Sequence, residues 1–335
     1  MEPTFNIFNK TISKNSPTLI IAEIGINHMG SEELCAQMIL SALGAGADCI
    51  KLQTVNIEES YHPNTLSYST FKNCELSKDA LERLSKLTKD NNGFLFSTPG
   101  DLSSLSLLES IGVAAYKVSS GLITNLPLIE EISNTKKPII FSTGMAKVED
   151  IDNIFKIVKY NNISLLHCVS LYPTPLNLLN LSYIRTLSNN YGVISGYSDH
   201  SNGDIACIAA VGMGAKIIEK HFTIDNKLKG ADNKMSMNAK SFKTMCKKIR
   251  EIDSMINGSN YKPHPLELNI RDSIYRKIAA KENIKIGEIF SKKNVCFIRY
   301  DGNNNCIDAS KWPLISGKIN KNFIQKSQMI TLNNL

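Results

Sequence analysis

Eight short apolar runs recur along the first 223 residues, and each run ends in polar residues. Their shortness, their β-branched side chains and the flanking glycines and prolines favour buried parallel strands over helices. Amphipathic segments with helical spacing lie between them, at 33–45, 78–90, 148–160 and 204–213. The predicted strands span residues 19–25, 49–54, 94–99, 114–120, 138–143, 164–170, 193–199 and 216–223.

The alternation of eight strands with helices predicts an α/β protein, a (β/α)8 TIM barrel closed by right-handed crossovers. A doubly wound open sheet is the alternative. Such a sheet normally carries a glycine-rich phosphate loop after its first strand, and this chain has none there. Residues 5–12 alternate apolar and polar side chains before the first barrel strand. We expect them to form a hairpin that closes the bottom of the barrel.

A second, smaller domain is predicted to follow the barrel. The helix-like segment 240–256 gives way to residues 257–265, which are rich in turn formers and prolines. Short β-type runs then occur at 273–279, 295–299 and 329–332. We therefore predict a barrel domain over residues 1–262, a linker over 263–272 and a small β-rich domain over 273–335.

The composition describes an ordinary globular protein. Of 335 residues, 42% are hydrophobic and 21% are charged. No apolar run approaches the roughly 20 residues of a membrane span. The first residues lack the basic and apolar regions of a signal peptide, so we expect a cytoplasmic protein with no membrane partner. Eight cysteines without CxxC spacing indicate reduced, buried thiols rather than a zinc site.

The net charge of +7 raises the question of nucleic-acid binding. The lysines, however, are spread along the chain, mostly on helix-like stretches such as 243–250, which indicates solvated helix faces. We therefore expect no nucleic-acid partner. A mildly positive field would instead favour an anionic small substrate.

Two histidines stand at the ends of consecutive predicted strands, His200 and His221. In a parallel barrel these positions lie at the rim where catalysis takes place. Imidazole is the commonest side chain that holds a catalytic divalent metal, and Asp232 follows shortly after. The pair therefore predicts a metal site. His167, inside another predicted strand, is equally compatible with a core position.

Polar residues end every one of the predicted strands. Lys51 and Lys117 supply point charges, and several serine and threonine hydroxyls can donate to phosphate oxygens. The pattern therefore predicts a site for a phosphorylated, oxygen-rich substrate. In the alternative interpretation both lysines are structural and pair with Glu23 or Glu219, and residues 219–221 form a surface charge cluster.

Taken together, the strand-end motifs resemble the sialic acid (nonulosonic acid) synthase family, which includes N-acetylneuraminate and legionaminate synthases. The matching motifs are Glu23-Ile24-Gly25-Ile26-Asn27-His28-Met29-Gly30, Lys51-Leu52-Gln53, Ser97-Thr98-Pro99, Lys117-Val118-Ser119-Ser120-Gly121, Ser142-Thr143-Gly144-Met145, His167-Cys168-Val169-Ser170-Leu171-Tyr172-Pro173, Gly196-Tyr197-Ser198-Asp199-His200 and Glu219-Lys220-His221-Phe222-Thr223. The tail resembles the family's antifreeze-like (SAF) domain through Arg271-Asp272-Ser273 and Ile286-Gly287-Glu288.

The resemblance implies a phosphoenolpyruvate-dependent transferase that forms a C–C bond. It would condense phosphoenolpyruvate with an N-acetylated hexose such as N-acetylmannosamine, with C–O cleavage, to give a nonulosonic acid and phosphate. It also implies a divalent metal, Mn²⁺ with Mg²⁺ or Co²⁺ as alternatives, on His200 and His221, where it would activate the sugar aldehyde. A domain-swapped homodimer is implied as well, in which the small domain inserts Arg299 into the partner's site.

The resemblance assigns roles to the remaining candidates. The implied catalytic residues are Glu23, Asp232, Lys51 and Lys117, and the implied substrate-binding residues are Gln53, Asn64, Thr98, Ser120, Ser142, Tyr172, Glu219 and Arg299. Of these, Tyr172 matches a sugar-side position and Asn64 a loop position.

The chain departs from the family's pattern at several places. Leu122 stands where the family has glutamate, Gly100 where it has phenylalanine, and Asn233 where it has histidine, and Tyr300 replaces a proline. Leu122 and Gly100 motivate a second hypothesis, a divergent homologue with weak or no synthase activity that binds a sugar or a partner. A third hypothesis is a Schiff-base aldolase that uses one of the two strand-end lysines.

Overall fold

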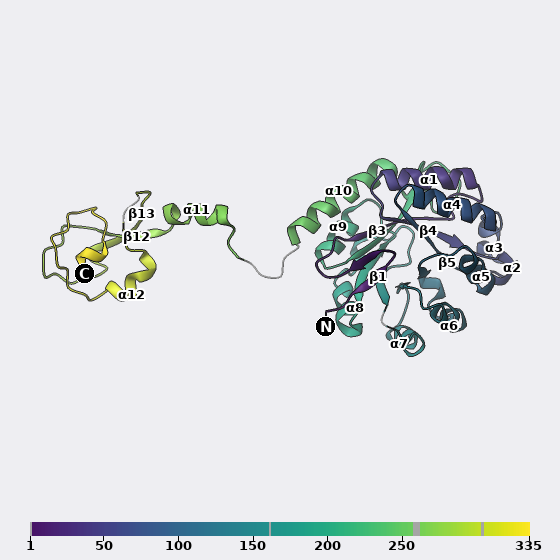
Figure 1. Cartoon of the computed structure of the whole chain (residues 1–335), viewed down its shortest axis with the longest axis horizontal. Helices are drawn as coiled ribbons and strands as arrows, with labels where there is room; N and C mark the ends of the chain where they lie inside the picture. Colours follow the sequence, from purple (N-terminus) through teal and green to yellow (C-terminus); the bar gives the residue numbers. More distant parts are fainter. Residues whose placement is uncertain (1, 161, 257–261, 303–304) are drawn as a thin grey trace. The chain divides into compact units, whose positions relative to one another are not determined.

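The computed structural model describes residues 2–160, 162–256, 262–302 and 305–335. The chain divides into two compact units, residues 1–258 and residues 259–335, which Figure 1 shows in different colours along the sequence. Among the helices that the structure describes, none combines the length and the apolar character that crossing a bilayer requires.

The first unit is built around eight parallel strands that close on themselves. The strands are β3 (Leu19–Gly25), β4 (Cys49–Thr54), β5 (Phe94–Pro99), β6 (Tyr116–Val118), β7 (Ile139–Ser142), β8 (Ile163–Cys168), β9 (Ile194–Asp199) and β10 (Ile217–Thr223). Consecutive strands pair in parallel from β3 to β9, and β10 pairs with both β9 and β3, which closes the barrel. The predicted (β/α)8 TIM barrel is confirmed, and all eight predicted runs contain a strand.

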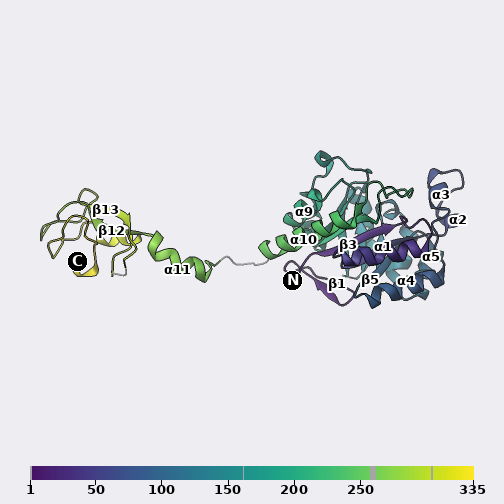
Figure 2. The same ribbon diagram turned by 90° about the horizontal axis from the view of Figure 1, so that it is seen from above.

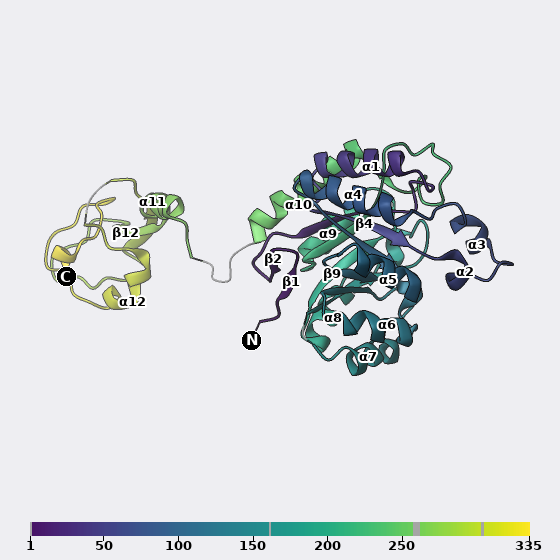
Figure 3. The ribbon, with the colours of Figure 1, turned by 45° about the vertical axis from the view of Figure 1, so that its right-hand side comes forward.

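Helices surround the barrel, as Figures 1 and 3 show. They are α1 (Glu32–Gly44), α4 (Lys78–Asp90), α5 (Leu102–Ser110), α6 (Leu126–Asn134), α7 (Val148–Ile157), α8 (Tyr183–Tyr191), α9 (Ile205–Gly212) and α10 (Ala239–Ile256), with the short α2 (Ile57–Ser60) and α3 (Leu66–Phe71) and the two-residue strand β11 (Met237–Asn238) in connections. The sequence explains their local structure. In α4, for example, the Ser77 side chain caps the first turn and Leu81 and Leu84 face the core.

The amino-terminal end of the barrel is closed by a hairpin, as predicted. Strands β1 (Phe5–Ile7) and β2 (Lys10–Ile12) pair in antiparallel fashion. Phe5, Ile7 and Ile12 are buried in one cluster with the first inward-facing residues of the barrel strands. An apolar plug therefore seals this end.

The second unit has its own small core. It contains α11 (Pro265–Ile274), the antiparallel pair β12 (Arg276–Ala280) and β13 (Val295–Arg299), and α12 (Trp312–Ile315). Its core includes Ile278, Phe290 and Ile330. The predicted run 295–299 coincides with β13. Much of the predicted linker, 263–272, lies in α11, which Figure 2 shows as a helix. Pro265 begins this helix and the His264 side chain caps it.

Candidate active site

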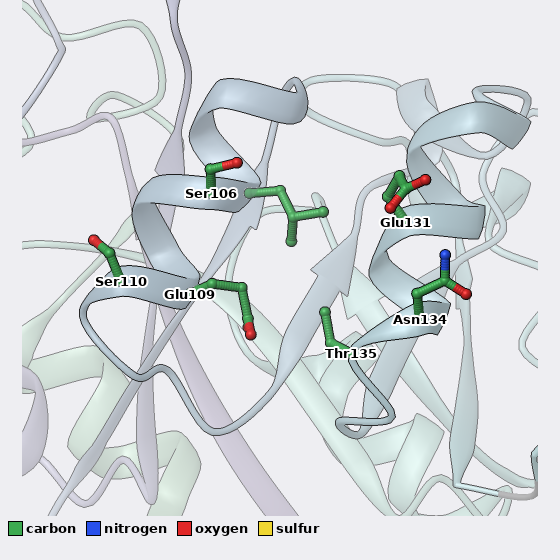
Figure 4. A pocket seen from close by; sticks show the side chains of 7 residues that line it. Ser106, Glu109, Ser110, Glu131, Asn134 and Thr135 are labelled. Atoms are coloured by element: carbon green, nitrogen blue, oxygen red, sulfur yellow. The ribbon is translucent and has the colours of Figure 1, made fainter.

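A cavity of about 330 Å³ opens at the carboxyl ends of the barrel strands. Most of the candidate residues from the sequence line it, namely Glu23, Lys51, Gln53, Lys117, Ser120, Ser142, Tyr172, His200, Glu219 and His221. A different groove, shown in Figure 4, lies between α5 and α6 in the helical layer. Its Glu109 is bonded to Lys137 and Tyr116, and none of the candidate residues from the sequence lines it.

The strand geometry explains why these side chains meet. Side chains alternate between the two faces of a strand, so every second residue points into the barrel. On β10, Ile217 belongs to the apolar cluster at the closed end, and Glu219 and His221 follow on the same inward face. On β4, Lys51 stands in the same way above Cys49. The inward-facing residues nearest the carboxyl ends of the strands therefore line the cavity.

Lys51 joins two buried carboxylates at the floor of the cavity. Its Nζ lies 2.9 Å from Glu23 Oε2 and 3.7 Å from Glu219 Oε2, and all three side chains are almost fully buried. Burial disfavours its charge, but the carboxylates of Glu219 and Glu23 outweigh burial and raise the pKa of Lys51. Gln53 and Ser198 donate to Glu23 and Glu219 respectively, each at 2.8 Å. Lys51 is therefore a charged amine inside a hydrogen-bonded network.

Lys117 is different, because no carboxylate of the described residues forms an ion pair with it. Its Nζ donates to Ser142 Oγ at 2.6 Å and to the Val118 carbonyl at 3.1 Å. Burial lowers the pKa of Lys117 to about 8, although the negative charge of Glu219 acts in the opposite direction. A buried cation without an anionic partner, next to hydroxyl groups, is suited to an anionic ligand.

Gly144 lets two hydroxyl groups approach the backbone beside Lys117. Its N–H donates to Ser120 Oγ at 3.0 Å. A Cβ at this position would lie 2.3 Å from Ser170 Oγ and 2.8 Å from Ser120 Oγ, so any larger residue would displace them. On the other side, Thr98 is buried with its Oγ1 3.5 Å from Lys51 Nζ.

The two histidines face one another at the cavity wall. Their ring centroids lie 5.3 Å apart, and the Tyr172 ring contacts His200 in a tilted arrangement with 4.1 Å between the ring centroids. His200 Nδ1 is 3.0 Å from the Val169 carbonyl, which leaves its Nε2 for a ligand. His221 Nδ1 is buried without a hydrogen-bond partner among the described residues and lies 3.7 Å from Asp232 Oδ2.

The donor set around His200 and His221 fits an open metal site. Burial and the neighbouring His200 lower the pKa of His221 well below its usual range, which favours the neutral ring that a metal ligand requires. At His200 burial acts in the same direction, but the contact with the Cys168 thiol outweighs it and raises the pKa. Within the described residues no group of three or more His, Cys, Asp and Glu side chains forms a closed metal cage. Two imidazoles would leave the remaining coordination positions to water and substrate. The metal itself stays a prediction.

Among the candidates of the first unit, Asn64, Thr98 and Asp232 do not line the cavity. Asn64 is exposed in the loop before α3, where its backbone N–H donates to His62. Arg299 is exposed on β13 of the second unit. Asp232 lies beside His221 without lining the cavity, and it remains close to the site.

Two of the family departures, Leu122 and Gly100, do not line the cavity. Leu122 ends the 3-10 turn η1 (Ser120–Leu122) and packs against the outer core. At Gly100 a Cβ would lie 2.7 Å from the Val55 side chain, so this position is close to the neighbouring loop. Neither residue touches the lysines or histidines described above.

The lining residues that were not among the sequence-predicted candidates include Cys168 and Met145. The alternation of inward and outward side chains along β8 could have identified Cys168. His167 points outward and contacts the Leu179 carbonyl at 2.6 Å, which makes it the core histidine of the alternative interpretation. The next residue must then point inward. Met145 has a left-handed φ of 64°, a conformation that no sequence pattern reveals.

Comparison with known proteins identifies the family. The model of the NeuB family matches residues 38–261. The chain belongs to the NeuB family. It is 34% identical to an N,N'-diacetyllegionaminic acid synthase of Campylobacter jejuni, over 93% of this chain and 98% of the relative. It is also 34% identical to a pseudaminic acid synthase of that species, over 84% of this chain and 86% of the relative.

A solved structure agrees with this assignment. The N-acetylneuraminic acid (sialic acid) synthetase of Leptospira borgpetersenii, in complex with citrate, superposes with a TM-score of 0.77. It is 34% identical and covers 82% of this chain and 98% of its own. The resemblance to sialic acid synthases is thus confirmed at the level of family and fold.

Proposed function

We propose that this protein condenses phosphoenolpyruvate with an N-acetylated hexose to give a nonulosonic acid and phosphate. The observation that carries the proposal is the cavity itself. It joins an unpaired buried lysine, Lys117, a lysine held between carboxylates, Lys51, and an open pair of imidazoles. The named synthases among the relatives support the same reaction class.

The lysine side of the cavity would bind phosphoenolpyruvate. Lys117 offers an unbalanced positive charge, and Ser120 and Ser142 place hydroxyls beside it. Phosphate and carboxylate groups satisfy such donors in a dry site. Binding an anion would also remove the cost of keeping Lys117 charged while it is buried.

The imidazole side would bind the sugar aldehyde. A divalent cation held by His200 and His221 would polarise the aldehyde oxygen as a Lewis acid. Tyr172, in contact with His200, would form the wall against which the sugar ring lies. Asp232, beside His221, is placed to supply a proton to the aldehyde oxygen as it becomes a hydroxyl.

The proposed reaction forms one C–C bond and breaks the C–O bond that joins C2 to phosphate. C3 of phosphoenolpyruvate attacks the aldehyde carbon, which forms the new C–C bond and leaves C2 cationic. Water adds to C2, and Glu23, held by Lys51 and Gln53, takes its proton. The C2–O bond to phosphate then breaks, phosphate leaves with the electron pair and takes the proton of the C2 hydroxyl, and the 2-keto acid remains.

The proposal includes the oligomeric state of the protein. The first unit alone supplies no arginine to the cavity lining. Arg299 on the second unit is exposed, so it is available to a second copy of the chain. We propose a homodimer in which Arg299 of the partner subunit completes the sugar side.

The proposal is tested by measuring phosphate release from phosphoenolpyruvate with Mn²⁺ and a panel of N-acetylated sugars. Release that requires both a sugar and the metal is expected, and omission of each serves as the control. Absence of release with every sugar would contradict the proposal and favour the divergent homologue that binds without turnover.

The Schiff-base aldolase is the second candidate, because burial lowers the pKa of Lys117 to about 8, as a lysine that forms imines requires. Borohydride trapping with pyruvate separates the two reactions. The synthase forms no imine, so the trapped protein should keep its unmodified mass. A mass increase that disappears in Lys117→Arg would establish the aldolase instead.

A further inference from the structure

Two buried residues of opposite charge directly precede the two cavity histidines. Asp199 ends β9 just before His200, and Lys220 lies on β10 just before His221. Asp199 and Lys220 are register partners on these adjacent parallel strands. Lys220 Nζ lies 2.6 Å from Asp199 Oδ2, and neither side chain is exposed to solvent. One ion pair therefore ties together the two strand ends that carry the imidazoles.

The ion pair lies outside the cavity, on the helix side of the barrel wall. The preceding rung, Ser198 and Glu219, lines the cavity, so the next rung must point away from it. In agreement, Cys207 of α9 contacts Asp199 Oδ2 at 3.3 Å. Asp199 and Lys220 can therefore act on the site only through the backbone and the histidines that follow them.

Further hydrogen bonds fix the backbone on both sides of His200. Asp199 Oδ1 accepts from the Ser201 backbone N–H at 2.8 Å and from the Tyr197 hydroxyl at 2.9 Å. Lys220 Nζ also donates to the Ser201 carbonyl. Ser201, the residue that follows His200, is thus held by both members of the ion pair, one of which belongs to the neighbouring strand.

We propose that Asp199 and Lys220 are positioning residues that set the distance and direction of the two imidazoles for a divalent cation. The inference rests on the proposed function, because that function supplies the cation. A fully buried ion pair is a poor source of stability compared with apolar packing, so its place behind both histidines calls for another role. Groups behind metal ligands commonly orient them and tune affinity.

The test measures Mn²⁺ affinity of the full chain without substrate, by electron paramagnetic resonance or calorimetry. The variant is Asp199→Asn with Lys220→Met, which removes both charges together and so leaves no buried charge unpaired. We expect Mn²⁺ to bind about 10- to 100-fold more weakly, the usual consequence of losing such supporting groups. Phosphate release should recover when the Mn²⁺ concentration is raised, whereas a general structural defect would not respond to metal.

Lys216→Met provides a matched control at the opposite end of the same strand region. Lys216 precedes β10, is buried, donates to the Ser16 carbonyl at 2.9 Å and lies 4.0 Å from Asp253. The Lys216→Met substitution removes a buried lysine and its ion pair without changing the end of β10 that carries His221. The Mn²⁺ affinity of this variant should equal that of the unmodified protein, even where its melting temperature falls.

The outcomes separate the inference from the proposed function. If the double variant does not fold, Asp199→Asn with Lys220→Gln, which also removes both charges but keeps a polar side chain at each position, gives the affinity. Unchanged affinity in a folded variant, or an equal loss in Lys216→Met, overturns the positioning role alone. If the unmodified protein binds no Mn²⁺, or if His221→Ala binds it equally well, the metal site of the proposed function falls and the inference falls with it.

Discussion

The two ends of the barrel are built from the same strands and carry opposite chemistry. At the amino-terminal end the inward positions are apolar, as in Ile21 and Ile217, and the hairpin covers them. One rung further along the same strands the inward residues are Glu23 and Glu219, and around them lie the lysines and histidines of the cavity. The change takes place within a single step of two residues.

This contrast explains the electrostatics of the site. The sealed apolar end keeps water away from the floor of the cavity, so each charge above it is desolvated. Burial is accordingly the largest influence on the pKa of Glu23, Lys51 and Lys117. Lys51 keeps its charge through two carboxylates, and Lys117 is left in need of a ligand. The closed end thus contributes to the burial that makes Lys117 suited to an anionic ligand.

The largest effect is expected when one side chain is removed from the open end of the barrel. His221→Ala should reduce turnover by about 10³-fold or more, because Lewis-acid activation contributes several kcal/mol. The melting temperature should change little, since the side chain lines a cavity. Phosphate release and thermal unfolding measure the two effects, and turnover equal to that of the unmodified protein would remove the proposed metal role.

The corresponding change at the closed end should affect stability and not chemistry. Phe5→Ala removes a fully buried ring from the plug and should lower the free energy of unfolding by about 3–5 kcal/mol. The kcat of the folded enzyme should be retained, because no cavity residue is touched. Denaturant unfolding and phosphate release provide the comparison. A large loss of kcat in folded protein would show that the two ends are not independent.

A change in the second unit tests whether the open end is complete in one chain. Arg299→Ala should raise the KM for the sugar by about 10-fold or more, the range for losing a hydrogen bond to a charged group, if the partner subunit supplies it. The KM for phosphoenolpyruvate should stay the same. An unchanged KM for the sugar would refute the swapped arrangement.

The smallest effect concerns pH. Because burial lowers the pKa of Lys117 to about 8, its charge is fully present below this pH and is lost as the pH rises through it. The KM for phosphoenolpyruvate should therefore be constant near pH 7 and rise about 10-fold for each pH unit well above 8. Lys117→Arg, which keeps its charge at all these values, should flatten the profile. A flat profile in the unmodified protein would contradict the role of Lys117.

Much of this arrangement follows from the sequence, because strand parity is a local property. The positions of Glu23, Lys51, His200 and His221 at strand ends were sufficient to predict that they meet. Parity also decides between the two interpretations of residues 219–221, which point into the cavity, away from it and into it again.

Other features depend on contacts that no local pattern specifies. The sequence gives no sign that Asp199 and Lys220 face each other, since register between two strands is a property of the closed barrel. Asn64 was expected in the site, but its place is set by a loop whose course depends on α2 and α3. Leu122, a departure from the family's motif, packs against the outer core, which only the fold reveals.

The most direct test of the proposed condensation traces the oxygen atom that bridges C2 and phosphorus in phosphoenolpyruvate. Phosphoenolpyruvate labelled with ¹⁸O at the oxygen that bridges C2 and phosphorus is turned over with Mn²⁺ and an accepted sugar. Attack at C2 in the open-end cavity predicts that the label leaves in phosphate, with one phosphate formed for each sugar consumed. Label retained in the keto acid, or phosphate released equally well without a sugar, would contradict the account.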